Sequence, residues 1–165
     1  MMERVNAILQ HTRFVEELER IKEYEKNRSY CRHGLDHLLD VARIAYILNS
    51  EINGERVAAP NVTKELIYAA ALLHDIGRAK QYEDGTPHEK ESAGIAEKLL
   101  PGCGFTKPET MVIIYAILSH RTNSSAGKPG LSGLLYRADK LSRRCFDCSM
   151  INDCDRDRKN TGLEY

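Results

Sequence analysis

The chain has 165 residues, of which 29% are charged, and its 24 lysines and arginines balance its 24 aspartates and glutamates. A formal net charge of zero provides no overall field that would attract nucleic acid or an anionic membrane surface, so we expect neither partner. The length suits one domain over residues 1–165, and because no stretch resembles a signal peptide or the roughly 20 apolar residues of a membrane span, we expect a cytoplasmic protein.

The first half of the chain predicts three helices. Apolar residues recur at helical spacing over residues 5–21, which indicates one amphipathic helix, and a second apolar stripe covers residues 35–50 before Gly54. A third helix follows Thr63, a candidate N-cap, and runs through an almost wholly apolar segment to Gly77, a candidate C-terminal cap. Its apolar character predicts that this helix is central and buried on most sides.

The second half predicts three further helices. Residues 86–89 combine a threonine N-cap, a proline at the first helical position and a capping-box glutamate, for a helix that stops at Pro101. Thr106 and Glu109 form a second capping box, and a last short helix covers residues 131–141. No alternating strand pattern is present, so the fold class is predicted to be all-α, a single bundle of about six helices.

His74 and Asp75 lie at the end of the apolar third helix, where burial of an ionised carboxylate is costly unless a positive charge compensates it. A metal ion is the natural partner, and imidazole with carboxylate ligands suits iron, manganese or zinc. Other candidate ligands stand at or near the ends of other helices: His33, His37, His88, His120 and Asp139. The pattern therefore predicts a metal site where several helix ends converge.

These segments resemble the HD-domain metal-dependent phosphohydrolase superfamily. The matching segments are His37-Leu-Leu-Asp-Val-Ala, Leu-Leu-His74-Asp75-Ile-Gly-Arg78 and Arg-Ala-Asp139-Lys140, in a core of about residues 31–144. The resemblance implies a helical bundle in which four residues bind a first divalent ion: His37, His74, Asp75 and Asp139. It also implies that His88 and His120 bind a second ion, with Asp75 bridging the two.

The resemblance implies hydrolysis of a phosphoester or phosphoanhydride in a small nucleotide-like or otherwise phosphorylated metabolite. Metal coordination lowers the pKa of water so that hydroxide forms near neutral pH. Asp75 and Arg78 are the expected catalytic residues, and four residues are candidates to bind substrate: Arg78, His33, Lys140 and Arg121. For His33 an alternative is weighed equally: it lies at the edge of the pocket and does not bind substrate.

Other functions within and beyond this superfamily stay open. The six-ligand pattern also resembles bacterial hydrolases that split diadenosine tetraphosphate, whereas the Gly-Tyr-Pro of cyclic-dinucleotide phosphodiesterases is missing. Mononucleotide phosphatases of the superfamily usually carry an acid where this chain has Arg78. A non-catalytic sensor of metal and nucleotide is the alternative from another class, and a homodimer is left open.

The C-terminal segment, residues 145–165, contains the second unusual feature. Cys145, Cys148 and Cys154 are closely spaced thiols that can chelate zinc or an iron–sulfur cluster, with Cys31 or His33 as a fourth ligand. The alternative is that they pack as small buried apolar groups, and Cys103 is expected in a loop. The basic residues at 143–144 and 156–159 are interleaved with acids, which predicts a solvated surface.

Overall fold

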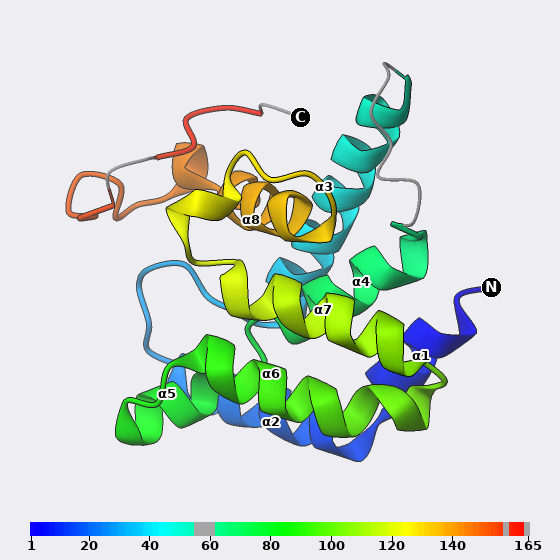
Figure 1. Cartoon of the computed structure of the whole chain (residues 1–165). Coiled ribbons are helices and arrows are strands. Elements are labelled where there is room, and N and C mark those ends of the chain that lie inside the picture. The colour runs from blue at the N-terminus through cyan, green and yellow to red at the C-terminus, as the bar shows by residue number, and fades with distance from the viewer. Residues whose placement is uncertain (55–61, 157–158, 164–165) are drawn as a thin grey trace.

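The structure, a computed structural model, describes residues 1–54, 62–156 and 159–163. These residues form eight α-helices and no strand, which confirms the all-α prediction. The α-helices are α1 Glu3–Gln10, α2 Thr12–Tyr24, α3 Leu35–Gly54, α4 Lys64–Leu73, α5 Arg78–Asp84, α6 His88–Leu99, α7 Lys107–Ser119 and α8 Leu131–Leu141 (Figure 1). Three short 3-10 helices are η1 Leu100–Cys103, η2 Asn123–Ser125 and η3 Cys145–Asp147. No helix in the described part of the chain is both long enough and apolar enough to cross a membrane.

Helix α4 is the centre of the bundle, as its apolar sequence predicts. Thr63 caps it by accepting a hydrogen bond from the Leu66 backbone N–H at 3.3 Å. The helix packs against α1, α3, α6, α7 and α8, and Leu72 and Leu73 are completely buried. Burial of each leucine side chain contributes roughly 2 kcal/mol. A helix held on all sides in this way fixes the position of the residues that follow its last turn.

The single helix expected over residues 5–21 is wrong, because the chain breaks at His11 into α1 and α2. His11 has an extended backbone, with φ −70° and ψ 127°. Its imidazole accepts a hydrogen bond from the Arg13 backbone N–H at 3.2 Å and so caps α2. The apolar period continues across this break, and the sequence pattern therefore did not reveal it.

Gly77 does not cap α4, which ends at Leu73; it precedes the unpredicted helix α5 instead. The glycine is required by close packing between α5 and α6. A Cβ atom at Gly77 would lie 2.6 Å from both the His88 carbonyl oxygen and the Ser92 backbone nitrogen. The Gly77 backbone N–H also donates to Ser92 Oγ at 2.9 Å, and the contact fixes the first turn of α6 beside the end of α4.

Of the two predicted capping boxes, only the second is present. Helix α6 begins at His88 with Pro87 at the N-cap position, where proline has no side-chain acceptor, and the Glu89 carboxylate pairs with Arg121 at 3.2 Å. At the start of α7, Thr106 Oγ1 accepts from the Glu109 backbone N–H, and Glu109 accepts from the Thr106 backbone N–H. The second box holds α7 in register at the end opposite to His120.

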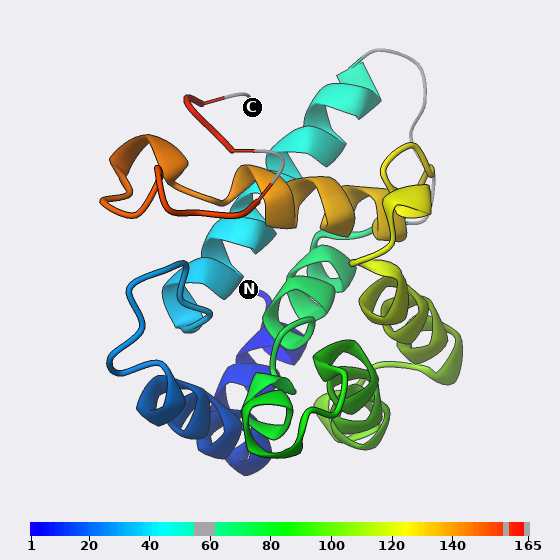
Figure 2. The ribbon, with the colours of Figure 1, turned by 90° about the vertical axis from the view of Figure 1, so that its left-hand side faces the viewer.

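Two irregular segments lie on the same side of the bundle, next to the end of α4 (Figures 1 and 2). One is the loop of residues 25–34 between α2 and α3, and the other is the segment that follows α8. The tail is anchored, because the Asn160 side-chain amide donates to the Leu141 and Arg143 carbonyl oxygens at 2.7 and 3.1 Å. These two segments form walls of a cavity that has a volume of about 860 Å³.

Candidate metal centre

The ends of helices α4 and α7 each present a buried histidine in the same local arrangement. His74 Nδ1 lies 2.7 Å from the Ala71 carbonyl oxygen, and His120 Nδ1 lies 2.6 Å from the Ile117 carbonyl oxygen. Because a carbonyl oxygen only accepts, each Nδ1 carries the proton. The Nε2 atom of each ring is thereby left with a lone pair for a metal ion.

Helices α3 and α8 and the end of α4 bring together a first group of donors. His37 Nε2 and His74 Nε2 lie 3.6 and 3.4 Å from Asp75 Oδ2, and 3.6 and 3.7 Å from Asp139 Oδ1. One donor atom from each of these four residues lies within 4.8 Å of all the others. Ser142 Oγ lies 3.3 Å from His37 Nδ1 and orients that ring from the end of α8.

A second group of donors lies on the other oxygen of the same aspartate. Asp75 Oδ1 lies 3.0 Å from His88 Nε2 and 3.7 Å from His120 Nε2, and the two imidazole nitrogens are 3.3 Å apart. These three residues form a second set within 4.8 Å. The Gln81 side-chain oxygen accepts from His88 Nδ1 at 2.7 Å, which leaves His88 Nε2 facing Asp75. Asp75 is thus common to both groups.

The arrangement fits a cation, because it gathers buried polar atoms that lack partners. Six buried side-chain nitrogen and oxygen atoms of the described residues make no hydrogen bond, and five belong to His37, His74, Asp75 and Arg78. Burial opposes ionisation of Asp75, but His74 and Arg78 hold its pKa well below the usual range. The pKa of Asp139 is lowered as well, by His74 and Lys140. Two ionised carboxylates beside imidazole nitrogens suit a divalent metal ion.

The cavity opens onto this centre and is lined by all four residues expected to bind substrate: Arg78, His33, Lys140 and Arg121. Three of them make ion pairs with acids: Arg78 with Asp75, Lys140 with Asp139, and Arg121 with Glu89. The Arg78 pair measures 2.8 Å and is largely buried, whereas the Arg121 side chain is half-exposed. These cations therefore differ in their exposure to solvent.

Comparison with known proteins assigns the family. The profile of the HD domain matches residues 34–144, two thirds of the chain. The chain belongs to the HD-domain family. This confirms the resemblance drawn from the segments around His37, His74 and Asp139, and the matched range contains all six candidate ligands.

Three proteins illustrate the range of similarity to this chain. An uncharacterised protein of Clostridium beijerinckii is 42% identical over 166 residues, which cover 99% of this chain and all of that protein. A predicted HD superfamily hydrolase from an uncultured Thermotogales bacterium superposes with a TM-score of 0.59 at 27% identity, over 86% of this chain and 67% of its own. Ribonuclease Y of Enterococcus faecalis is 35% identical over 114 residues, which cover 69% of this chain but only 19% of that enzyme.

His33, which directly precedes the range matched by the HD profile, has buried hydrogen-bond partners that were not predicted from the sequence. It is 4% exposed, and the Glu25 carboxylate accepts from its backbone N–H at 2.6 Å and contacts its Nδ1 at 2.5 Å. The Tyr82 hydroxyl donates to the same carboxylate at 2.6 Å. Burial lowers the pKa of His33 to about 4, so its ring is neutral at pH 7. Glu25 continues the buried stripe of Phe14 and Ile21, and an acid at that spacing was the available signal.

The four cysteines considered as a second metal or redox site all line the cavity beside the metal centre: Cys31, Cys145, Cys148 and Cys154. Cys145 is buried and the other three are partly exposed. Within the described residues, however, no three of their sulfur atoms lie within 4.8 Å of one another, so they do not form a preassembled ligand set. Their metal or redox role stays a prediction. Cys103 is not an open loop residue: it is buried in η1, which raises the pKa of its thiol.

Proposed function

We propose that the protein is a metal-dependent phosphohydrolase that cleaves a phosphoester or phosphoanhydride bond in a small nucleotide-like or otherwise phosphorylated metabolite. The observation that supports this most strongly is the position of Asp75. One of its oxygens faces His37 and His74, and the other faces His88 and His120. We propose two divalent ions, of iron, manganese or zinc, with Asp75 between them. The ligands of the first are His37, His74, Asp75 and Asp139, and those of the second are Asp75, His88 and His120.

The chemistry of such a site suits phosphate hydrolysis. Divalent ions lower the pKa of bound water and stabilise negative charge on phosphoryl oxygens. The protein contributes orientation: the Nδ1 bonds of His74 and His120 fix both rings before any ligand binds. Arg78 stands beside Asp75 on the cavity wall and supplies guanidinium N–H donors for phosphate oxygens. Lys140 and Arg121 line the same cavity and add positive charge to its wall.

The cavity supports a substrate larger than a simple phosphate ion. Its volume of about 860 Å³ falls in the range of roughly 300–1,000 Å³ typical of small-molecule sites. The similarity to enzymes named ribonuclease Y supports a second candidate, hydrolysis of a phosphodiester. A dinucleoside polyphosphate or a cyclic dinucleotide would also present bonds of these classes.

The experiment is a metal-reconstitution assay. The purified protein is stripped of metal, reloaded with Mn²⁺, Fe²⁺ or Zn²⁺, and assayed for phosphate release from nucleotides and for cleavage of bis-p-nitrophenyl phosphate. We expect activity that depends on metal and falls at least about 100-fold in Asp75→Asn, because the amide loses the charge that both groups share. Metal binding without turnover of any phosphate compound, with every metal restored, contradicts the proposal and favours a sensor.

A further inference from the structure

The cavity beside the metal centre contains positive charges that have no partner among the residues that the structure describes. Nine lysines and arginines and six aspartates line it. Most of these cations already have partners: Arg78, Arg121, Lys140 and Arg144 pair with carboxylates, and Arg28 and Arg32 donate to backbone carbonyl oxygens. The other three have no side-chain hydrogen bond or ion pair with the part of the chain that the structure describes: Arg143, Arg156 and Lys159.

The exposure of these three cations differs from that of the unpaired acids around them. Arg143, Arg156 and Lys159 are all only partly exposed. The wall aspartates without an ion pair are all exposed to solvent: Asp36, Asp147, Asp153 and Asp155. Water screens those carboxylates, whereas the cations hold their charge in a recess, where it acts more strongly. Arg144, whose side chain is 65% exposed, fits the expectation of a solvated surface over residues 143–144 and 156–159, whereas Arg143 and Arg156 are only partly exposed.

Arg143 and Arg156 line the same cavity as the candidate ligand Asp139. The C-terminal segment that carries Arg156 is held against Arg143, because the Asn160 side-chain amide donates to the Arg143 carbonyl oxygen at 3.1 Å. Burial and the Arg156 charge lower the pKa of Arg143, and the Asp139 carboxylate acts in the opposite direction. Two like charges on this wall, one just after α8 and one in the C-terminal segment, are unfavourable unless an anion lies between them. Guanidinium groups are well suited to that anion, because they bind phosphate through two parallel N–H donors.

We propose that Arg143 and Arg156 form a second anion-binding subsite, next to Asp139, that holds a phosphate group other than the one being cleaved. The proposal rests on the proposed function, and it narrows the substrate to compounds with at least two phosphate groups close together. A phosphate at the metal centre leaves this pair unneutralised, whereas a second phosphate on the same molecule contacts it. Lys159, on the same wall, adds a third positive charge.

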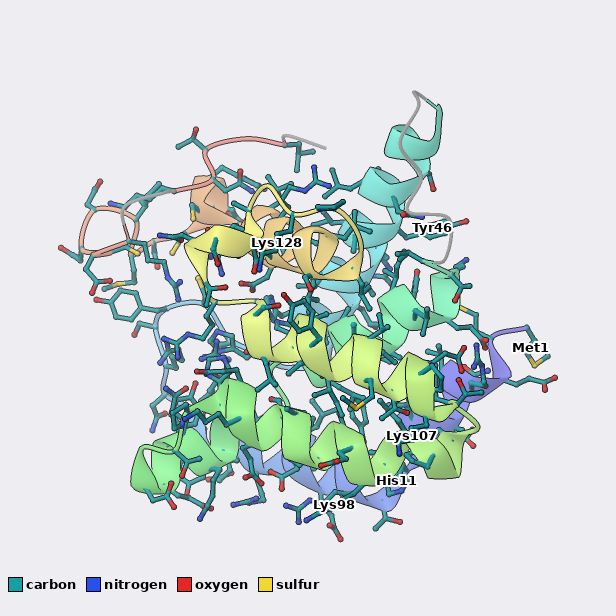
Figure 3. All side chains as sticks on the ribbon, viewed as in Figure 1. Met1, His11, Tyr46, Lys98, Lys107 and Lys128 are labelled. Atoms are coloured by element: carbon teal, nitrogen blue, oxygen red, sulfur yellow. The ribbon has the colours of Figure 1, made fainter. Side chains whose placement is uncertain are left out.

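Two non-hydrolysable probes test the subsite at equilibrium. Methylphosphonate has one phosphonate group, and methylenediphosphonate has two on one carbon. Their dissociation constants are measured by calorimetry on the purified, metal-loaded full chain. The variants are Arg143→Gln and Arg156→Gln, each checked for folding by circular dichroism, with Lys98→Gln as the control. Lys98 is exposed and lies toward another part of the bundle, away from the C-terminal segment (Figure 3).

We expect each arginine variant to bind methylenediphosphonate about tenfold more weakly and methylphosphonate less than twofold more weakly. Lys98→Gln should change neither dissociation constant. Arg156→Gln keeps the test decisive if Arg143→Gln fails to fold, because Arg156 lies outside the helices. Equal affinity of the wild-type protein and the folded variants for methylenediphosphonate overturns the proposal. An equal loss for both probes also overturns it, since that result shows general electrostatics in place of a second subsite.

Failure of this subsite and failure of the proposed function are separable. If the protein cleaves bis-p-nitrophenyl phosphate but the arginine variants bind the diphosphonate as the wild-type protein does, the hydrolase proposal holds and the subsite proposal fails. Arginine-dependent diphosphonate binding without cleavage of any phosphate compound retains the subsite in a protein that binds without turnover.

Discussion

Arg78 Nε lies 2.8 Å from Asp75 Oδ2, so the aspartate shared by both donor groups also carries a guanidinium as its direct neighbour. The Arg78 side chain is 17% exposed and borders the cavity. It can therefore reach a bound phosphate while one N–H group remains on Asp75. Burial alone would lower the pKa of Arg78, yet Asp75 raises it, so the group is charged at any working pH.

Replacement of Arg78 should separate catalysis from metal binding. We expect Arg78→Gln to lower kcat/KM for a phosphoester about 10- to 100-fold, the effect of losing one charge-assisted hydrogen bond of roughly 1.5–3 kcal/mol. Metal content should stay equal or rise, because a competing cation beside Asp75 is gone. Arg78→Lys keeps the charge but loses the paired donors, so its kcat/KM should lie between those of the wild-type protein and Arg78→Gln. An unchanged kcat/KM in Arg78→Gln would show that Arg78 does not take part in catalysis.

The two donor groups predict separate losses of metal. We expect His37→Ala and His120→Ala each to lower the bound metal by one ion per chain, and Asp75→Asn to lose both. The measurement is elemental analysis of purified protein after dialysis, with anomalous scattering to locate each ion. His11→Ala is the matched control, since His11 only caps α2. One ion in the wild-type protein, retained in His120→Ala, contradicts the binuclear site.

The packing of Gly77 against α6 predicts a loss of stability on the smallest substitution. A methyl group at Gly77 would come within 2.6 Å of backbone atoms of His88 and Ser92, so Gly77→Ala should destabilise the fold by about 1–3 kcal/mol. Gly94→Ala is the control, because a Cβ there meets nothing within 4 Å and alanine favours the helix by roughly 0.5–1 kcal/mol. Chemical unfolding measures both. Equal stability of the two variants would show that α6 moves freely away from α5.

The buried His33 predicts that stability falls in mild acid. The folded chain keeps His33 neutral down to about pH 4, whereas an ordinary histidine gains a proton near pH 6.5. Between these values the unfolded chain binds the extra proton, so unfolding becomes easier as the pH decreases, by about 2–3 kcal/mol in total. Glu25, whose pKa is lowered to about 2 by His33 against the effect of burial, stays ionised throughout this range.

Urea unfolding at pH 7, 6 and 5 measures the effect, with His33→Asn as the comparison. Asparagine keeps an N–H donor near the Nδ1 position for Glu25 but does not titrate. The variant should lose less stability than the wild-type protein over this range, since the two proteins differ in a titratable group only at position 33. Parallel curves for the two proteins would mean that His33 is protonated equally in the folded and unfolded chains.

The central helix and the donor residues were predictable because their signals are local. Each ligand stands at a helix end marked by an apolar run or a cap, and the order of His37, the His74–Asp75 pair and Asp139 identified the family before any coordinates. The capping box at Thr106 was found for the same reason, since four consecutive residues contain all its hydrogen bonds.

Features that depend on distant parts of the chain were not predictable. The support of His33 by Glu25 and Tyr82 joins three segments, and nothing near Gln81 indicates that it orients His88. Charged residues of the C-terminal segment suggested a solvated tail, whereas folding turns Arg156 toward the cavity. Burial of a polar group is a tertiary property, and local periodicity reports only which face of an element is apolar.

The bonds from His74 and His120 to carbonyl oxygens three residues earlier have a consequence for the order of assembly. Each bond needs only the last turn of its own helix, so it forms when that helix forms and does not wait for the other ligands. Docking of α3, α6 and α8 then completes a site in which these two imidazoles already have the required tautomer. Metal capture should therefore follow helix packing without a separate step in which the rings reorient.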